Sequence, residues 1–392
     1  MEPREMRAFH RKSVILALAV SSVAFLHAQK SPLLVQFVKG NIADKTAAIR
    51  EAGEEEKSAL AEKGLDFLDA NSELLSDDRD LSALGVVSVL SLSSSQPQNG
   101  VILEKLISVF KKCADTNVRT VILDKLPDFA QDEEGRAKVR VLVEEFLSSD
   151  ENKSVSLIKN SFGALGKIGN QESLAFVFEQ YATNEQQNLA DDMGQSLVTL
   201  MNLYPDESLR LISSSEISKI SKIFDLVSKS SKITKNYQMD VVETALSQTL
   251  ITMENQQDFS EENVRFQLRL VEFIAKEKWA HATDLVAQNF SVAKKEYGEN
   301  VLSEEDFIQT IRFTAALKSS KISAALSDCL ARFNGMVDKE SHPSEQIVLA
   351  LINSLGDLGD KTAFDNLLYV TYLDYSDEVV TAARVALASL KW

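Results

Sequence analysis

Apolar residues recur at intervals of three and four along most of the chain, most clearly between Ser344 and Trp392. One stripe consists of Val348, Leu351, Ile352, Leu355 and Leu358; a second of Ala363, Phe364, Leu367, Leu368 and Thr371; a third of Val380, Ala383, Leu387 and Leu390. Each spacing places its residues on one face of a helix. The segment therefore predicts three amphipathic helices, which bury their apolar faces only if similar units stack on them.

Glycine-containing breaks separate these predicted helices. Leu355-Gly-Asp-Leu-Gly-Asp360 is matched position for position by Leu165-Gly-Lys-Ile-Gly-Asn170. Gly359 suits the left-handed conformation just past a helix end, where a Cβ would be strained, and the polar residue after it can cap the next helix. We interpret six residues as repeat turns: Gly166, Gly169, Asn170, Gly356, Gly359 and Asp360. The repeat is best preserved at 155–181 and 344–392.

Degenerate versions of the unit extend this pattern over the rest of the chain. Residues 101–127 and 305–335 are weaker candidates, and breaks near residues 276, 319 and 359 are spaced by about forty residues. The 392-residue chain has only 14 Gly and 6 Pro and no hairpin signal between alternating runs. The sequence predicts an all-α array over residues 29–392, with no linker that divides it.

The motif Leu-Gly-x-[Ile/Leu]-Gly-[Asn/Asp], followed by a helix, a polar turn and Val-x-x-Ala-Ala, resembles HEAT repeats of the short bacterial, phycobilisome-lyase-like kind. Lys361 and Gln171 stand where that family has Pro, and Thr381 where it has Arg. The resemblance implies a right-handed α-solenoid of stacked antiparallel helix pairs, HEAT/armadillo-like, with about eight or nine pairs. It also implies a scaffold that binds another protein along its inner, concave helices. An enzyme-assisting, lyase-like or chaperone role is the alternative.

The first 28 residues are typical of a secretory signal peptide. Arg7, Arg11 and Lys12 precede an apolar run from Val14 to Leu26, and Leu26-His27-Ala28 is a passable cleavage site. We expect cleavage after Ala28 and export to the periplasm or beyond. Glu2 and Glu5 fit a signal poorly, which favours Met6 as the start. In the alternative, residues 13–26 stay as an inner-membrane anchor of an envelope assembly factor.

The formal net charge of −16 disfavours nucleic acid and anionic lipid as partners, because both require basic surfaces. The expected partner is another protein, and the oligomeric state is left open. One stretch reverses the charge locally, with Lys219, Lys222, Lys229, Lys232 and Lys235. These lysines form either a basic patch for an acidic partner or an ordinary solvated helix face.

Residues that carry chemistry are scarce. Only His281 and His342 remain after signal removal, and phosphate-loop, zinc-protease and serine-hydrolase motifs are missing. We therefore predict no catalytic residue, cofactor or metal, and interpret His281, beside Trp279, as a packed or rim residue. Asp77-Asp-Arg-Asp80 reads as a solvated helix start in preference to a calcium loop. Cys113 and Cys329 are expected to be buried free thiols, since distant repeats lie beyond disulfide reach.

Overall fold

The computed structural model describes residues 31–71, 78–95, 99–149, 153–184 and 186–391. Over these residues the regular structure consists of twenty α-helices and two 3₁₀ turns, and one isolated bridge between Asp360 and Lys391 is the only β-type pairing. The predicted all-α class is therefore confirmed. The expectations for the signal segment and for Asp77 fall outside the described residues, as does the last residue of the repeat predicted at 344–392.

The chain divides into two compact units. Unit 1 contains residues up to Ser173 together with Gln186–Ser196, and unit 2 contains Leu174–Glu185 together with Leu197–Trp392. The division runs through α10 (Gln171–Thr183) and α11 (Gln187–Leu203) and not through a linker.

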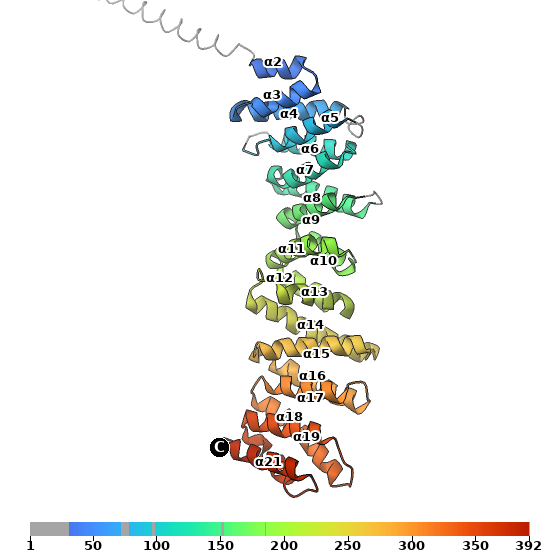
Figure 1. Ribbon diagram of the computed structural model, residues 1–392, viewed down its shortest axis with the longest axis vertical. Helices are drawn as coiled ribbons and strands as arrows, with labels where there is room; N and C mark the ends of the chain where they lie inside the picture. The colour runs from blue at the N-terminus through green and yellow to red at the C-terminus, as the bar shows by residue number, and fades with distance from the viewer. Residues whose placement is uncertain (1–30, 72–77, 96–98, 150–152, 185, 392) are drawn as a thin grey trace, which may run out of the picture. The chain divides into compact units, whose positions relative to one another are not determined.

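Unit 1 stacks its helices in two rows that alternate along the chain (Figure 1). Its helices are α2 (Pro32–Lys39), α3 (Ile42–Glu51), α4 (Glu54–Asn71), α5 (Arg79–Leu90), α6 (Asn99–Lys112), α7 (Thr116–Phe129), α8 (Glu133–Ser148) and α9 (Val155–Ile168). Helices α3, α5, α7 and α9 pack on one another in succession, and α4, α6 and α8 form the other row. Starts at residues 42, 79, 116 and 155 give the repeat its period of nearly forty.

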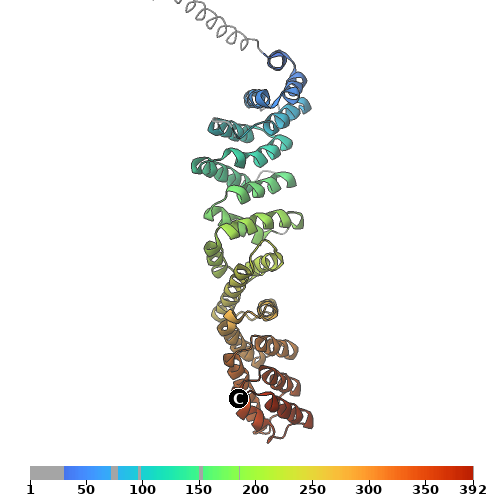
Figure 2. The same ribbon diagram turned by 90° about the vertical axis from the view of Figure 1, so that its left-hand side faces the viewer.

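Unit 2 has the same alternation (Figure 2). Its helices are α12 (Pro205–Ser213), α13 (Ile217–Lys229), α14 (Lys235–Gln256), α15 (Glu261–Lys276), α16 (Thr283–Gly298), α17 (Glu304–Ala315), α18 (Ser320–Val337), α19 (Glu345–Leu358), α20 (Phe364–Val370) and α21 (Asp377–Ser389), with 3₁₀ turns η2 (Ala280–Ala282) and η3 (Lys361–Ala363). Helices α15, α17, α19 and α21 form one row, and α12, α14, α16, α18 and α20 the other. Consecutive helices thus pack in sequence order, as in an all-α solenoid.

The buried face of α21 differs from the predicted one. Val379, Ala383, Ala386 and Leu390 are buried, whereas Val380 and Leu387 are only half-buried. The helix packs against both α19 and α20, and its contact with α19 requires the small Ala386 to face Gly356. The sequence pattern alone favours larger residues for the buried face. It therefore assigned Val380 and Leu387 to that face in place of their neighbours Val379 and Ala386.

Gly166 and Gly356 do not turn the chain, which corrects their interpretation as turn residues. Both lie inside helices, Gly166 in α9 and Gly356 in α19. A Cβ on Gly166 would lie 3.3 Å from Cα of Ser196, and one on Gly356 would lie 3.2 Å from Cα of Ala386. These glycines instead let two helix backbones approach closely.

The second glycine of each motif does stand at a helix end, but the two glycines differ in conformation. Gly359 adopts the predicted left-handed conformation with φ 65°, whereas Gly169 is extended with φ −63° and ψ 156°. The polar residues that follow act as caps: Asn170 Oδ1 accepts from the Ser173 amide and Asp360 Oδ1 from the Thr362 amide, both at 2.9 Å. The expected capping is confirmed at both positions.

Left-handed residues mark every helix break from α14 to α20. They are Gln257, Lys278, Asn300, Lys318, Glu340 and Gly359, and among the described residues these six are the only ones with positive φ. At three breaks the amide after the left-handed residue donates to a carbonyl five residues back, from Trp279 to Ile274, Val301 to Glu296 and Ser341 to Met336. This bond defines the Schellman helix end.

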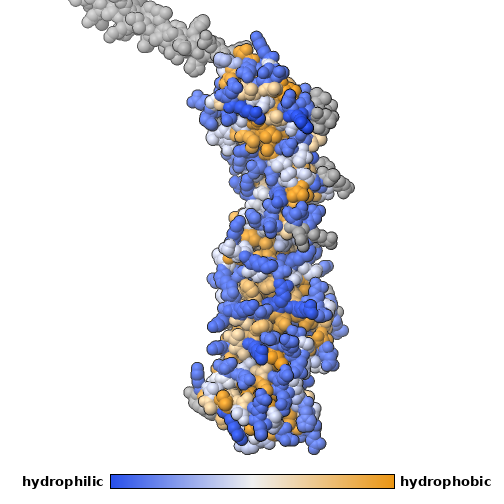
Figure 3. Space-filling model, viewed as in Figure 1, coloured by the Kyte–Doolittle hydropathy of each residue, from blue (hydrophilic) through white to orange (hydrophobic). Residues whose placement is uncertain are grey.

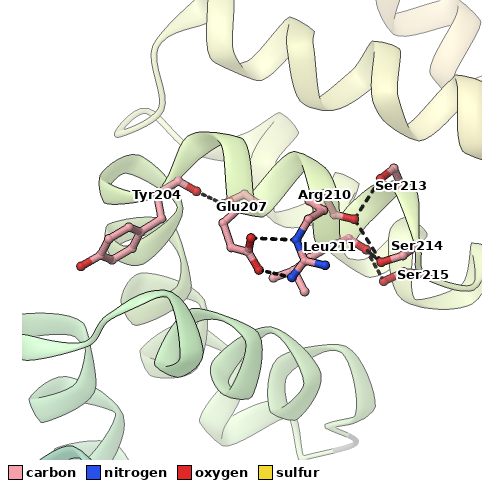
Figure 4. A network of polar contacts seen from close by, with 8 residues as sticks. Tyr204, Glu207, Arg210, Leu211, Ser213, Ser214 and Ser215 are labelled. Atoms are coloured by element: carbon pink, nitrogen blue, oxygen red, sulfur yellow. Dashed lines mark hydrogen bonds and ion pairs between the residues drawn. The ribbon is translucent and has the colours of Figure 1, made fainter. Parts of the chain in front are cut away.

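Helix α12 ends without a left-handed residue (Figure 4). The hydroxyls of Ser213 and Ser214 donate to the Arg210 carbonyl at 2.9 and 3.0 Å, and that of Ser215 donates to the Leu211 carbonyl at 2.7 Å. Serine hydroxyls therefore satisfy the last carbonyls of the helix, which would otherwise lack donors. The Arg210 guanidinium makes a bidentate pair with Glu207 on the same helix.

A polar seam joins α18 to the η3–α20 segment. Asn366 Nδ2 donates to the Ser327 hydroxyl at 2.8 Å and to its carbonyl at 3.1 Å, and Asn334 Nδ2 donates to the Asn366 carbonyl at 3.0 Å. Thr362 Oγ1 bonds to Ser323 Oγ at 3.0 Å. Because Ser323, Ser327 and Asn334 are buried, these bonds replace those that the groups would make with water.

Candidate functional site

A groove with a volume of about 970 Å³ crosses the α3–α5–α7–α9 row of unit 1. We call it the unit 1 groove. Its lining consists of Arg50, Asp78, Arg79, Ser82, Ala83, Val86, Val87, Asp115, Asn117, Thr120, Val121 and Ser156. Four helices that are neighbours in this row thus contribute to one surface, although other helices separate them in the chain.

The floor of the groove is apolar and built from small side chains. Ala83, Val86 and Val87 lie on one side of α5, and Val121 lies on α7; all four are half-buried. Large side chains are missing here, although they fill the core directly beneath, as with Leu84 and Ile122. The floor offers van der Waals contact to a guest without being filled by the protein itself.

The walls carry two arginines with no internal partner. Arg50 and Arg79 are exposed, and neither side chain forms an ion pair or hydrogen bond with another described residue. Lysines of the same row differ: Lys159 pairs with Asp192 at 2.8 Å and Lys167 with Asp124 at 3.5 Å. The arginines of the groove therefore keep their hydrogen-bonding capacity for a ligand.

The carboxylates of the groove are engaged in capping. Asp78 Oδ1 accepts from the amides of Asp80 and Leu81 at 2.9 and 3.2 Å, and Asp115 Oδ1 accepts from the Val118 amide at 2.9 Å. Asp78 is thus the start of a helix, as the sequence predicted. The groove lining contains no His, Cys or Lys, so its own residues suit recognition better than proton transfer or nucleophilic attack.

The predicted basic patch is partly neutralised by carboxylates of unit 2. Lys219 pairs with Glu179 at 2.7 Å, and this partner raises the pKa of the lysine. Lys235 pairs with Glu277 at 2.7 Å and lies over the Phe273 ring, and Lys222 donates to the Asn184 carbonyl at 3.3 Å. Lys229 and Lys232 are exposed. Binding of an acidic partner by this patch stays a prediction.

His281 lies on the rim of unit 2, where the sequence placed it. Its Nδ1 lies 3.0 Å from Glu243 Oε1, an oxygen that also accepts the Trp279 indole N–H. The hydrogen bond to Glu243 raises the pKa of His281. The imidazole is 77% exposed, and the described ranges contain no cluster of three His, Cys, Asp or Glu residues that fits a metal ion.

The two cysteines are buried and unpaired, as predicted. Burial raises the pKa of both thiols, that of Cys329 to about 11. A thiol with so high a pKa is almost entirely protonated at neutral pH and is therefore a poor nucleophile.

Two features were missed by sequence reasoning. The groove left no signal, because Ser82, Ala83, Val86 and Val87 read as an ordinary moderately apolar helix face. The burial of Glu296 did leave a signal in the sequence, because the residue follows Phe290 and Ala293 at helical spacing. All three residues are buried.

In Figure 3 apolar residues show in small groups between hydrophilic ones, and not as one continuous face. Within the described ranges, no helix has both the length and the apolar character needed to cross a membrane. Comparison of the chain with models of known protein families and with curated proteins finds no match to either.

Proposed function

We propose that the chain is a non-catalytic, exported scaffold or adaptor of HEAT-like repeats, which binds a segment of another protein in the unit 1 groove. The observation that supports this most is the groove itself: its volume is about 970 Å³, its floor is apolar, and its two arginines have no partner among the described residues.

The mixture of groups in the groove matches the chemistry of a polypeptide. Small aliphatic side chains of a partner can contact Val86 and Val121, and its carbonyl or carboxylate oxygens can accept from Arg50 and Arg79. Asn117, Thr120 and Ser156 add donors and acceptors at the edge. A helical row has no strand edge to extend, so the partner is held through side chains and not by strand addition.

Export is the part of the proposal that rests on residues 1–28. A charged start, a short apolar run and a small residue at position 28 support it. N-terminal sequencing of the protein from its native envelope tests it directly. A chain that begins at Gln29 supports export with cleavage, whereas retention of residues 13–26 supports the anchored form.

Groove binding is tested by pull-down from envelope extract with the mature chain and two variants. Val86→Lys with Val121→Lys places two charges on the groove floor, and Val385→Lys is the matched control at a 67% exposed position in unit 2. We expect the wild type and the control to capture the same polypeptides in equal amounts. The groove variant should capture at least about tenfold less of them.

A photo-crosslinker at Ser82 then identifies the bound segment. Equal capture by the groove variant, provided that its circular dichroism matches the wild type, would exclude the groove as the binding site. If no polypeptide is captured and a glycan or small molecule raises the melting temperature instead, the scaffold proposal fails. Lys229→Glu with Lys232→Glu in the same assay tests the basic patch separately.

A further inference from the structure

Glu296 is a buried carboxyl group with no cation beside it. It lies on α16 and is only 2% exposed, and neither of its oxygens has a hydrogen-bond partner among the described residues. A buried ionised carboxylate in such surroundings is strongly disfavoured, because nothing replaces its hydration.

Its polar neighbour is Gln267 on α15, which is also buried. Gln267 Nε2 donates to Asn289 Oδ1 at 2.9 Å, which leaves Gln267 Oε1 without a donor. Oxygens of Glu296 and Gln267 are therefore acceptors that lack a hydrogen. We call Gln267, Asn289 and Glu296 the α15–α16 polar cluster.

The charges around the cluster do not favour an ionised Glu296. Burial is the main cause that raises its pKa to about 7, Glu299 just past the end of the same helix contributes in the same direction, and the nearby Gln267 side chain acts in the opposite direction. From α14, α15, α17 and α18, which surround this part of the stack, no other charged group acts on it, and no Lys or Arg of the described chain pairs with it.

We propose that Glu296 holds a proton below neutral pH and donates its O–H to Gln267 Oε1. Glu296 then donates to Gln267 and Gln267 donates to Asn289, which completes a buried chain of hydrogen bonds between α15 and α16. One proton removes the buried charge of the carboxyl group and supplies the donor that the orphaned amide oxygen lacks.

Release of this proton reverses the effect. The ionised carboxylate and Gln267 Oε1 are then both acceptors, so the bond from Glu296 to Gln267 is lost and a negative charge is left buried. The main chain of the same residue closes the next turn, because the Glu296 carbonyl accepts from the amides of Val301 and Leu302 at 2.8 and 3.2 Å. The cluster therefore works as a proton-dependent lock on the stretch from α15 to α17.

The direction of the pH effect follows from the raised pKa. Stability contributed by a group whose pKa is higher in the folded than in the unfolded state is fully present below the unfolded value, near 4.5. It declines as pH rises through the folded value of about 7. The lock is closed in mildly acidic solution and weakened in alkaline solution.

The test uses hydrogen exchange of the full chain at pH 6 and pH 8, corrected for intrinsic exchange. Wild-type protection of α15–α17 should fall by roughly tenfold or more between the two values, given the size of the shift. Glu296→Gln, which stays neutral, should show no such fall. Glu262→Gln, which removes an exposed carboxylate from α15, should behave as the wild type does.

Infrared spectroscopy supplies a measurement that does not depend on a variant folding. A carbonyl stretch of a protonated carboxylic acid should be present in the wild type at pH 6, disappear with a midpoint near 7, and be absent from Glu296→Gln. Its absence at pH 6 would show that the amides are rotated so that Gln267 donates to an ionised Glu296, and would overturn the proposal. The proposal would also be overturned if adding Ca²⁺ at pH 8 restored protection in the wild type but not in Glu296→Gln. That result would show that the oxygens of Glu296 and Gln267 hold a cation.

Discussion

Unit 1 and unit 2 each stack their helices in two alternating rows, but they differ in the backbone conformations that lead from one helix to the next. In unit 1 the helix ends at Gly40, Ala52, Ser149 and Gly169 are extended, and those at Ser91 and Ala130 have other conformations with negative φ. In unit 2 each break from α14 to α20 contains one left-handed residue, and only the last of the six is glycine.

Glycine serves another purpose in unit 1. Gly85 on α5 faces Val118 of α7, and a Cβ on it would lie 2.6 Å from Val118 Cγ2. Gly64 on α4 meets Ser88 in the same way, and Gly166 meets Ser196. Unit 1 therefore uses glycine within helices to bring them close together, as Gly356 also does in unit 2, whereas five of the six left-handed breaks of unit 2 are formed by residues that carry side chains. A glycine in the sequence does not by itself mark a turn in this protein.

The largest expected effect is that of filling a close approach in unit 1. Gly85→Ala should destabilise unit 1 by about 1–3 kcal/mol, because Val118 has no room to move without disturbing α7. Gly163→Ala on α9 is the matched control: its Cβ meets nothing within 4 Å, so it should stabilise the helix by up to about 1 kcal/mol. Hydrogen exchange in each unit measures both, and a stable Gly85→Ala chain would contradict the packing argument.

A smaller effect is expected at the one left-handed glycine of unit 2. Gly359→Ala should cost about 1 kcal/mol, since an L residue is strained at φ 65°. Gly169→Ala should cost less, because that glycine is extended. Denaturant unfolding, with exchange to localise the change, distinguishes the two. Equal losses would mean that the two motifs are conformationally equivalent after all.

The smallest effect has the opposite sign. Lys318 has φ 46°, so Lys318→Gly should relieve strain and stabilise α17–α18 by about 0.5 kcal/mol, after the greater freedom of glycine in the unfolded chain is taken into account. Lys318→Ala removes the same charge but keeps a Cβ, and should bring no gain. A gain in both variants would trace the effect to charge and remove the backbone explanation.

Much of the architecture was predictable, because helical periodicity and sparse Gly and Pro act locally. Apolar spacing located the helices, and the breaks near 276, 319 and 359 fall at the ends of α15, α17 and α19. Repeats without a glycine motif were harder to see, because Lys278, Lys318 and Glu340 occupy turns that sequence patterns associate with glycine or asparagine.

The candidate site was not predictable from single residues. The unit 1 groove exists only because α3, α5, α7 and α9 lie next to one another, so its lining comes from residues that are more than a hundred positions apart, from Arg50 to Ser156. The basic patch showed the reverse problem. Its lysines were easy to find, but Glu179 and Glu277, which neutralise two of them, lie about forty positions away.

The polar seam between α18 and α20 sets the register of the last repeat. Purely aliphatic helix faces tolerate sliding by a turn, because one leucine contact resembles the next. A slip here would separate the amides of the buried Asn334 and the half-buried Asn366 from their acceptors, and each polar group left buried without a partner costs about 1–3 kcal/mol. The seam therefore permits only one register of the two helices. When the repeats are pulled past each other, its hydrogen bonds should break together and not one after another.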